Sequence, residues 1–378
     1  MTDSNMTDTE MEIENELEAS TTVETEGAHE EFDEVKKEQG VLYMGIDLGT
    51  SRTSVSASNG QRVTMQSYVG YPKDVVSRKL LKKDVLFGDE ALKHRLSLNL
   101  YRPLAHGVLK CSEDEDDFDG NLKAAEDLIR EVIRQARPRK DELVYAVIGA
   151  PAQASINNKD AIVKAARESV DSVMLCSEPF SVAYGIDRLD DVLVIDIGAG
   201  TTDLCRMHGT MPEDADQITT TFAGDHIDEA LSRNLKESFP EAQFTIQMIK
   251  KLKEKHATVA EHCEPIVVEL PVNGRPVEFD ITTQMQDAAR SIVTPLVEGL
   301  GSLIGTFDPE FQDRMKQNVL LAGGGSQIKA LDVALENEMH RLLGSGKVTR
   351  IEEPMYGGAN GALKIAHDMP AEYWEKLK

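Results

Sequence analysis

The sequence predicts an α/β protein built from two similar halves. From residue 41 onward, short runs of β-branched and apolar residues alternate with segments of helical periodicity, which is typical of α/β folds. Two short segments, 46–51 and 195–200, are almost alike: each continues an apolar run through an aspartate into a glycine-containing turn. The length of 378 residues is enough for two domains of ordinary size. We therefore expect a duplicated architecture in which each half begins with one of the two segments.

The first half is predicted to open with three antiparallel strands. Turns at Gly49 and at Asn59-Gly60 separate these strands, and an Asn-Gly pair is a strong hairpin signal. The less regular, lysine-rich stretch 70–102 indicates a small inserted subdomain. Apolar residues at helical spacing predict an amphipathic helix over about 121–136. The other elements expected in this half are strands at 41–47, 53–58, 62–68, 143–149 and 172–176, a helix over about 155–170, and a helix that begins near 178.

The second half is predicted to begin near residue 188 and to repeat the opening pattern at 192–196. The Gly-Gly-Gly-Ser segment 323–326 follows a buried strand and is expected to open a helix that ends near residue 343. Trp374, the only tryptophan, is expected to pack against the body. The remaining expected elements are helices at 225–239, 243–263, 284–307 and 357–367, a strand at 318–322, and a hairpin of strands 266–270 and 277–281 that turns at Asn273-Gly274.

The net charge of −25 is concentrated at the N-terminus. Residues 1–40 hold 14 acidic residues against two lysines, which leaves −13 on the rest of the chain. This tail has no apolar periodicity and one aromatic residue, so we expect it to be disordered. Its composition fits a solubilising extension or an interaction tail, and both interpretations stay open.

Charge and hydropathy argue against several classes of protein. An acidic body disfavours nucleic acid as a partner. No run approaches the roughly 18 apolar residues of a membrane-spanning helix, and an acidic start does not fit a secretory signal. We therefore expect a cytosolic protein with no direct membrane insertion.

Asp47 and Asp196 end apolar strands, where a packing role for an aspartate is hard to explain. A buried carboxylate needs a cation or several hydrogen-bond donors. Two such hairpins that face each other across a cleft would clamp a metal and a polyphosphate, with backbone N–H groups on the phosphates and the carboxylates holding Mg²⁺ through water. Small and hydroxyl residues beside each aspartate would allow close approach to the phosphates: Gly49, Thr50, Ser51, Gly198, Gly200, Thr201 and Thr202.

Two further segments are rich in glycine, and the first of them has two possible roles. The turn of Gly323, Gly324 and Gly325 could approach a flat ligand closely, and its place in the series suggests contact with adenine or ribose. A glycine-rich helix cap would explain this turn about as well. Gly357-Gly358, at the start of the last helix, fits close packing between two helices.

Five segments resemble the motifs of the superfamily of actins, sugar kinases and heat-shock-chaperone ATPases, and they occur in the same order. They are 46–54 (first phosphate motif), 147–152 with the helix at Glu178 (first connecting motif), 195–204 (second phosphate motif), 321–326 (adenosine motif) and 357–363 (second connecting motif). The resemblance covers residues 41–378.

This resemblance implies an actin-like ATPase fold, in which two RNase H-like domains flank a nucleotide cleft. Domain I would comprise 41–187 and 354–378, with a small subdomain at about 61–103. Domain II would comprise 188–353, with a subdomain at about 223–288.

The resemblance also implies a role for each site residue. Asp47 and Asp196 would organise Mg²⁺ and its waters, and Glu178 would orient or deprotonate the water that attacks the γ-phosphate of ATP. Lys253 and Glu254 resemble the helix that contacts ribose and adenine in actins, although a solvated charged face would have the same composition. The implied contacts of ATP or ADP also include the two phosphate loops, Gly224, the turn 323–325 and Gln327.

Within the superfamily, segments 102–108 and 178–180 resemble bacterial actins. The segments 69–75, 177–180 and 321–326 and the ending Tyr373-Trp374 are similar to the magnetosome-associated actins of magnetotactic bacteria, while the acidic tail and the acidic run 113–119 depart from their pattern. The implied function is ATP-dependent self-association into cytoskeletal filaments, with hydrolysis driving turnover. Adaptor proteins would link the filament to an organelle membrane.

Three other functions occur in the superfamily. A chaperone ATPase would need a peptide-binding domain, for which we expect no room after the last helix. A sugar or acetate kinase would need a general base beside an acceptor pocket, and no convincing signature for one is present. A membrane-bound, MreB-like cell-shape actin is the nearest alternative, but a tail of charge −12 would be repelled by an anionic membrane.

Overall fold

Two five-stranded sheets with the same topology form the framework of the computed structural model, which describes residues 40–110 and 118–377. The strand order is β10-β9-β1-β2-β3 in the first sheet and β13-β12-β11-β16-β17 in the second. In each sheet the first three strands pair antiparallel, and the last two join on the other side as parallel strands. The predicted duplication is therefore confirmed.

The strand bounds agree closely with the sequence expectations, except that the strands at 202–207, 217–220 and 348–350 were not predicted. The first sheet consists of β1 (Val41–Leu48), β2 (Arg52–Ala57), β3 (Arg62–Gln66), β9 (Leu143–Ala150) and β10 (Ser172–Ser177). The second consists of β11 (Val192–Ile197), β12 (Thr202–Met207), β13 (Gln217–Thr220), β16 (Val319–Ala322) and β17 (Val348–Arg350).

Each sheet buries one face in a core of its own. Alternate residues of β1, such as Met44 and Ile46, join a core with residues of α3 (Phe118–Gln135) and α4 (Ile156–Arg167). Alternate residues of β11, such as Ile195, join a second core with residues of α9 (Val293–Gly305) and α11 (Leu331–Leu343). Because side chains alternate along a strand, each sheet presents one of its two faces to its own core.

The other faces of the two sheets share a third core. It includes Val147 of β9 and Val194 of β11, together with residues of α5 (Glu178–Gly185) and α12 (Gly357–Asp368). We call α5 and α12 the middle layer. Trp374, on α13 (Ala371–Lys376), is fully buried there and stacks on Tyr145 with ring centroids 5.0 Å apart, which confirms its predicted packing.

Glycines let the middle layer pack very tightly. A Cβ at Gly45 of β1 would overlap the backbone of α12, and one at Gly361 would overlap the backbone carbonyl of Ser181 in α5. The helix contact predicted for Gly357-Gly358 is present at Gly357, where a Cβ would lie 3.6 Å from Val182 of α5, and is tightest about one turn later, at Gly361.

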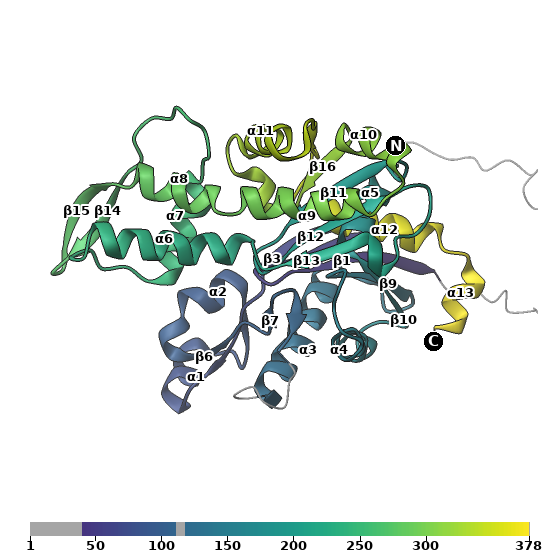
Figure 1. Ribbon diagram of the computed structural model, residues 1–378. Coiled ribbons are helices and arrows are strands. Elements are labelled where there is room, and N and C mark those ends of the chain that lie inside the picture. The colour runs from purple at the N-terminus through teal and green to yellow at the C-terminus, as the bar shows by residue number, and fades with distance from the viewer. Residues whose placement is uncertain (1–39, 111–117, 378) are drawn as a thin grey trace, which may run out of the picture. The chain divides into compact units, whose positions relative to one another are not determined.

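Two smaller units extend from the sheets. Figure 1 shows α1 (Val75–Leu81) and α2 (Gly88–Lys93) beside the separate sheet β5-β4-β6, which is the small insertion predicted at 70–102. The strands of that sheet are β4 (Val69–Pro72), β5 (Leu86–Phe87) and β6 (Leu98–Tyr101). The second unit contains α6 (Gly224–Ser238), α7 (Ile246–His256), α8 (Thr282–Arg290) and the hairpin of β14 (Val267–Val272) and β15 (Arg275–Asp280). A short hairpin, β7 (Leu104–Ala105) with β8 (Val108–Leu109), follows β6.

Several helix predictions need correction. The helix expected over 284–307 is two helices, α8 and α9, because Pro295 lies in the first turn of α9, where its missing N–H breaks no hydrogen bond. The helix expected over 243–263 ends at His256. The helix expected directly after the 323–326 turn begins only at Leu331, and α10 (Pro309–Lys316) was not predicted.

The predicted acidic tail, residue 40 excepted, and residues 111–117, which hold most of the predicted acidic run, lie outside the described residues. Within the described part of the chain, no helix combines the length and apolar character needed to cross a membrane.

Candidate functional site

Asp47 and Asp196 converge because each lies on the strand face that looks toward the middle layer. Side chains alternate along a strand, so Asp47 shares its face with Gly45, which packs on α12. Asp196 shares its face with Val194 of the middle core. Glu178 is the first residue of α5, which belongs to the same layer. Two sheets and one helix therefore bring three carboxylates to one place.

Glycines leave room for each of these carboxylates. A Cβ at Gly358 would lie 3.1 Å from Oδ2 of Asp47, and one at Gly149 would lie 3.3 Å from Cγ of Glu178. A Cβ at Gly323 would overlap Oδ1 of Asp196. Gly323 also has φ +74°, a conformation that favours glycine. The glycines thus fix where the acidic side chains can lie.

The carboxylates are strongly perturbed. Burial raises the pKa of Asp47 to about 6. Burial, followed by the charges of Asp203, Asp47 and Asp196, raises the pKa of Glu178 well above its usual range. Burial and the charges of Asp47 and Asp203 do the same to the pKa of Asp196. Within the described residues, every charge that shifts the pKa of Glu178 or Asp196 is another carboxylate, so no basic side chain offsets the charge of this group of carboxylates.

Asp203, within the second phosphate motif, is a fourth member of this group. Burial raises its pKa to about 6, although hydrogen bonds from Thr219 Oγ1 (2.6 Å) and the Ala152 amide (3.0 Å) oppose that rise. Both bonds reach one carboxylate oxygen, and the other oxygen has no hydrogen-bond partner in the structure.

The two phosphate loops are tied together by segment 102–107. The amide of Gly107 donates a hydrogen bond of 2.7 Å to Oγ1 of Thr50 in the first loop, and Nε of Arg102 donates one of 2.9 Å to the carbonyl of Thr50. Nδ1 of His106 lies 3.2 Å from the carbonyl of Gly200 in the second loop. A Cβ at Gly200 would meet Oγ1 of Thr50 at 2.7 Å. The loops therefore lie against each other at the bottom of a cleft.

This cleft has a volume of about 1100 Å³, near the upper end of the roughly 300–1000 Å³ typical of small-ligand sites. All but one of the predicted site residues line it: Asp47, Gly49, Thr50, Ser51, Glu178, Asp196, Gly198, Gly200, Thr201, Gly224, Lys253, Glu254, Gly323, Gly324, Gly325 and Gln327. The exception is Thr202, which is fully buried and donates its hydroxyl to the carbonyl of Phe222 at 2.8 Å. Its predicted contact with phosphate therefore has no support in this geometry.

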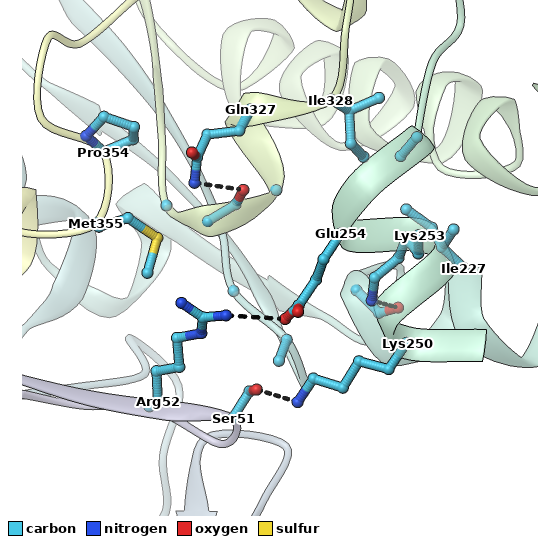
Figure 2. Close-up of a pocket in the computed structure, with 18 of the residues that line it drawn as sticks. Ser51, Arg52, Ile227, Lys250, Lys253, Glu254, Gln327, Ile328, Pro354 and Met355 are labelled. Carbon is cyan, nitrogen blue, oxygen red and sulfur yellow. Dashed lines mark hydrogen bonds and ion pairs between the residues drawn. The ribbon is translucent and has the colours of Figure 1, made fainter. Parts of the chain in front are cut away.

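One face of α7 reaches across the cleft. Its residues Gln247, Lys250 and Glu254 follow the helical spacing i, i+3, i+7. Figure 2 shows Lys250 hydrogen-bonded to the hydroxyl of Ser51. It also shows the ion pair between Glu254 and Arg52, in which Oε1 of Glu254 lies 3.1 Å from Nη2 of Arg52. Nε2 of Gln247 donates a hydrogen bond of 3.0 Å to the hydroxyl of Tyr68. We call these three residues the α7 stripe.

Glu254 of the α7 stripe was predicted from the sequence as a site residue, whereas Gln247 and Lys250 were missed. Lys250 is buried, and burial, followed by the charge of Arg102, lowers its pKa to about 8. The helical spacing was visible in the sequence, but its partners lie about 180 to 200 residues away in the chain. Lys253, which was predicted, turns instead to the carbonyl of Gly224 at 2.7 Å and to Asp228 at 2.8 Å.

The glycine-rich turn forms a separate 3₁₀ segment, Gly324–Gln327, that follows β16. The hydroxyl of Ser326 bonds to the carbonyl of Gly323 at 2.7 Å, and Nε2 of Gln327 bonds to the carbonyl of Gly324 at 3.4 Å (Figure 2). Because α11 has its own N-cap at Ala330, the helix-cap interpretation of this turn is wrong. Gly323, Gly324 and Gly325 line the cleft, and Figure 2 shows Gln327 of the same segment across the cleft from Lys250 of α7.

Comparison with known proteins agrees with this architecture. The MreB/Mbl protein family model matches residues 42–372. This chain belongs to the MreB/Mbl family. The actin-like protein MamK of Paramagnetospirillum magneticum is 39% identical over 336 residues, which is 89% of this chain and 95% of the relative. The predicted resemblance to bacterial actins is therefore confirmed.

Solved structures of MamK share the fold of this family member. A subunit of the MamK double helical filament has 38% identity and a TM-score of 0.83, over 88% of this chain and all of that chain. A non-polymerising MamK mutant bound to AMPPNP has the same identity and a TM-score of 0.66, over 87% of this chain and all of that chain. At equal identity and nearly equal coverage, the filament subunit is the closer match in three dimensions. The actin-like fold predicted from the sequence is thus confirmed.

The donor set of this MreB/Mbl protein fits a hydrated divalent cation. Asp47, Asp196 and Glu178 supply oxygen ligands without a cationic side chain to neutralise them, and Mg²⁺ prefers such oxygen ligands while it keeps several waters. Within the described residues, no three His, Cys, Asp or Glu side chains are placed to hold a metal directly. A metal shared with water and phosphate oxygens agrees with both observations.

Proposed function

We propose that this protein is an actin-like ATPase that assembles into filaments with bound ATP and Mg²⁺, and that hydrolysis of ATP to ADP and phosphate drives filament turnover. The observation that carries the proposal is the convergence of Asp47, Asp196 and Glu178 from both halves of the fold at the bottom of one large cleft. Carboxylates concentrated there without a counter-charge suit a metal-bound polyphosphate.

In the proposed reaction, Asp47 and Asp196 would hold Mg²⁺ through its waters, and the metal would neutralise charge on the phosphates. Backbone amides of the two loops would orient the triphosphate. Glu178 accepts a proton from the attacking water while the oxygen of that water bonds to the γ-phosphorus. ADP leaves with the electron pair of the broken P–O bond. The raised pKa of Glu178 makes this carboxylate a stronger base than a solvent-exposed glutamate.

The nucleotide would lie between α7 and the glycine-rich turn. Lys253, Glu254 and Gly224 would stand on one side of the ribose and adenine, and Gly323, Gly324, Gly325 and Gln327 on the other. The cleft geometry in Figure 2 supports this placement, because the two groups face each other across the open space.

Assembly into filaments is proposed from the family. Solved MamK structures include a double helical filament, and the present fold matches that subunit with a TM-score of 0.83. A head-to-tail contact that does not close into a ring generates such a filament. We further propose that adaptor proteins link the filament to an organelle membrane, as expected for a magnetosome-associated actin. Two domains, 41–187 with 354–378 and 188–353, would move against each other during the cycle.

The test separates catalysis from assembly. Glu178→Gln should lower the steady-state release of phosphate about 10²- to 10³-fold, because the proton acceptor is lost. Filaments of this variant should still sediment with ATP and Mg²⁺, and should disassemble more slowly. Glu168→Gln, an exposed change at the end of α4, is the matched control.

Two outcomes would contradict the proposal. Phosphate release by Glu178→Gln at the unmodified rate would remove Glu178 from its role. Absence of polymer from the unmodified protein under every nucleotide and salt condition would remove the filament. Flotation with anionic liposomes would favour the MreB-like alternative.

A further inference from the structure

We propose that Arg102 is a positioning residue that holds the first phosphate loop in its binding geometry only while the cleft is closed. Its guanidinium forms two different contacts. Nε donates to the carbonyl of Thr50 at 2.9 Å, and Nη2 donates to the two carboxylate oxygens of Asp225 at 2.8 and 3.1 Å. The consequences for nucleotide turnover rest on the proposed function, whereas the effect on the loop does not.

Asp225 is itself anchored to the second phosphate loop. Its amide donates a hydrogen bond of 2.6 Å to the carbonyl of Ala199, and the amide of Gly224 donates one of 3.1 Å to the carbonyl of Gly198. The chain of contacts therefore runs from Thr50 through Arg102 and Asp225 to Ala199. It joins the loop after β1 to the loop after β11.

The contact cannot survive separation of the two halves. Thr50 follows β1 of the first sheet, whereas Asp225 is on α6 of the second unit, beyond β13 of the second sheet. If the cleft widens, Arg102 keeps Thr50 or Asp225 but not both. Without Asp225 the guanidinium of Arg102 is no longer fixed, so closure determines how firmly Arg102 holds the carbonyl of Thr50 and the amide that follows.

The contact between Arg102 and Asp225 differs from an ordinary exposed ion pair in its burial and in its second partner. Such pairs contribute about 0–1 kcal/mol and bridge mobile side chains, whereas the Arg102 and Asp225 side chains are 26% and 29% exposed. The Nε bond also goes to a backbone carbonyl of the phosphate loop. The planar guanidinium presents its donors in a fixed fork, so lysine at this position keeps the charge and cannot make both contacts in this geometry.

The experiment uses the full chain, three single variants and one double variant that combines Arg102→Lys with Asp225→Asn. Arg102→Lys keeps the charge and breaks the bridge. Asp225→Asn has the same size and removes the anchor. Arg130→Lys is the matched control, because Arg130 also bridges two groups, the carboxylates of Asp127 and Glu168, but lies on α3 outside the cleft.

The first measurement is amide hydrogen exchange of residues 49–53 without nucleotide. Arg102→Lys and Asp225→Asn should each speed this exchange about tenfold, and Arg130→Lys should leave it unchanged. The two changes combined should add little to either one, because both break the same bridge. Equal exchange in all five proteins, each shown to be folded by circular dichroism, would overturn the proposal.

The second measurement is the dissociation of a fluorescent ATP analogue with Mg²⁺. The two cleft variants should release it about tenfold faster than the unmodified protein and than Arg130→Lys. If the unmodified protein binds no nucleotide, the proposed function fails, while the hydrogen-exchange result still decides the role of Arg102. If all variants release nucleotide at one rate, Arg102 does not act on the bound nucleotide, and the proposal is wrong in that part.

Discussion

Asp47 is the single residue whose chemistry is easiest to test. Its pKa of about 6 lies above the value of about 3.9 expected in an unfolded chain. The folded protein therefore holds this proton more tightly than the unfolded chain. The stability that this provides is fully present below about pH 4 and is lost as the pH rises through about 6.

Asp47→Asn should therefore stabilise the nucleotide-free protein at pH 7. We expect a gain of about 1–3 kcal/mol in the free energy of unfolding, measured by denaturant titration, and little gain at pH 4. The exposed change Asp141→Asn is the control and should have no effect at either pH. Equal stability of Asp47→Asn and the unmodified protein at pH 7 would show that the ionised Asp47 carboxylate does not destabilise the fold.

Gly323 offers a second test at the residue scale. Gly323→Ala should cost about 2–4 kcal/mol, because φ +74° is unfavourable for alanine and its Cβ would overlap both Asp196 and the Ile197 carbonyl. Gly274→Ala has a similar φ of +78° and open space around it, so it should cost only the backbone part, about 1–2 kcal/mol. Thermal unfolding measures the loss of stability in each variant, and the difference between the two losses gives the cost of the Cβ overlap at Gly323. A similar loss in the two proteins would contradict the assigned packing of Gly323.

Single residues also show what the sequence can reveal. Asp47 and Asp196 were identifiable because each is embedded in a repeated strand-and-turn pattern. Lys250 and Arg102 were not predicted as site residues, because their importance arises from Ser51 and Asp225, which are 199 and 123 residues away in the chain. Thr202 was predicted from its hydroxyl, but this hydroxyl donates to the carbonyl of Phe222 and the residue does not line the cleft, a difference that strand alternation explains.

At the scale of elements, α1 carries a surface that the folded monomer leaves uncovered. Val75, Val76 and Leu80 are 82%, 76% and 71% exposed, and Leu96, whose carbonyl bonds to Lys73 just before α1, is 84% exposed. Between residues 73 and 95, seven lysines and arginines stand against four acidic residues, in a chain of net charge −25. An apolar and basic surface on an acidic molecule suits contact with a second copy of the same chain.

Val76→Asp should therefore weaken filament assembly. Burial of one such side chain contributes about 1.5 kcal/mol, so the critical concentration for assembly should rise about tenfold or more, as measured by sedimentation. The free energy of unfolding should not change, because Val76 is exposed. Ile156→Asp, at a site 77% exposed on α4, is the matched control. If Val76→Asp assembles like the control, α1 is not part of the contact.

Elements also differ in how well their sequences predict them. The β14–β15 hairpin was predictable because Asn273 and Gly274 both take the positive φ that a tight turn requires. The division of 284–307 into α8 and α9 was harder, since apolar spacing continues through both helices. Pro295 was the available signal, and it marks the first turn of a helix as readily as a break.

Under the proposed function, nucleotide affinity would depend on pH, because both halves contribute carboxylates to one cleft. Binding of Mg²⁺ and ATP would require these groups to be ionised, whereas burial raises the pKa of Asp47 to about 6. Lowering the pH from 7.5 to 5.5 should therefore weaken binding of Mg²⁺–ATP by at least about fourfold, the share expected for one such group.

Isothermal titration calorimetry in two buffers of different ionisation enthalpy would measure both the affinity and the protons released. We expect release of about one proton or more at pH 5.5 and much less at pH 7.5. Asp47→Asn, if it still binds, should release fewer protons at pH 5.5, and ATP with EDTA should release almost none, because the metal is what requires ionised carboxylates. Identical proton release with and without Mg²⁺ would show that the acidic cluster does not face the metal. Nucleotide binding would then depend on the loops and the α7 stripe alone.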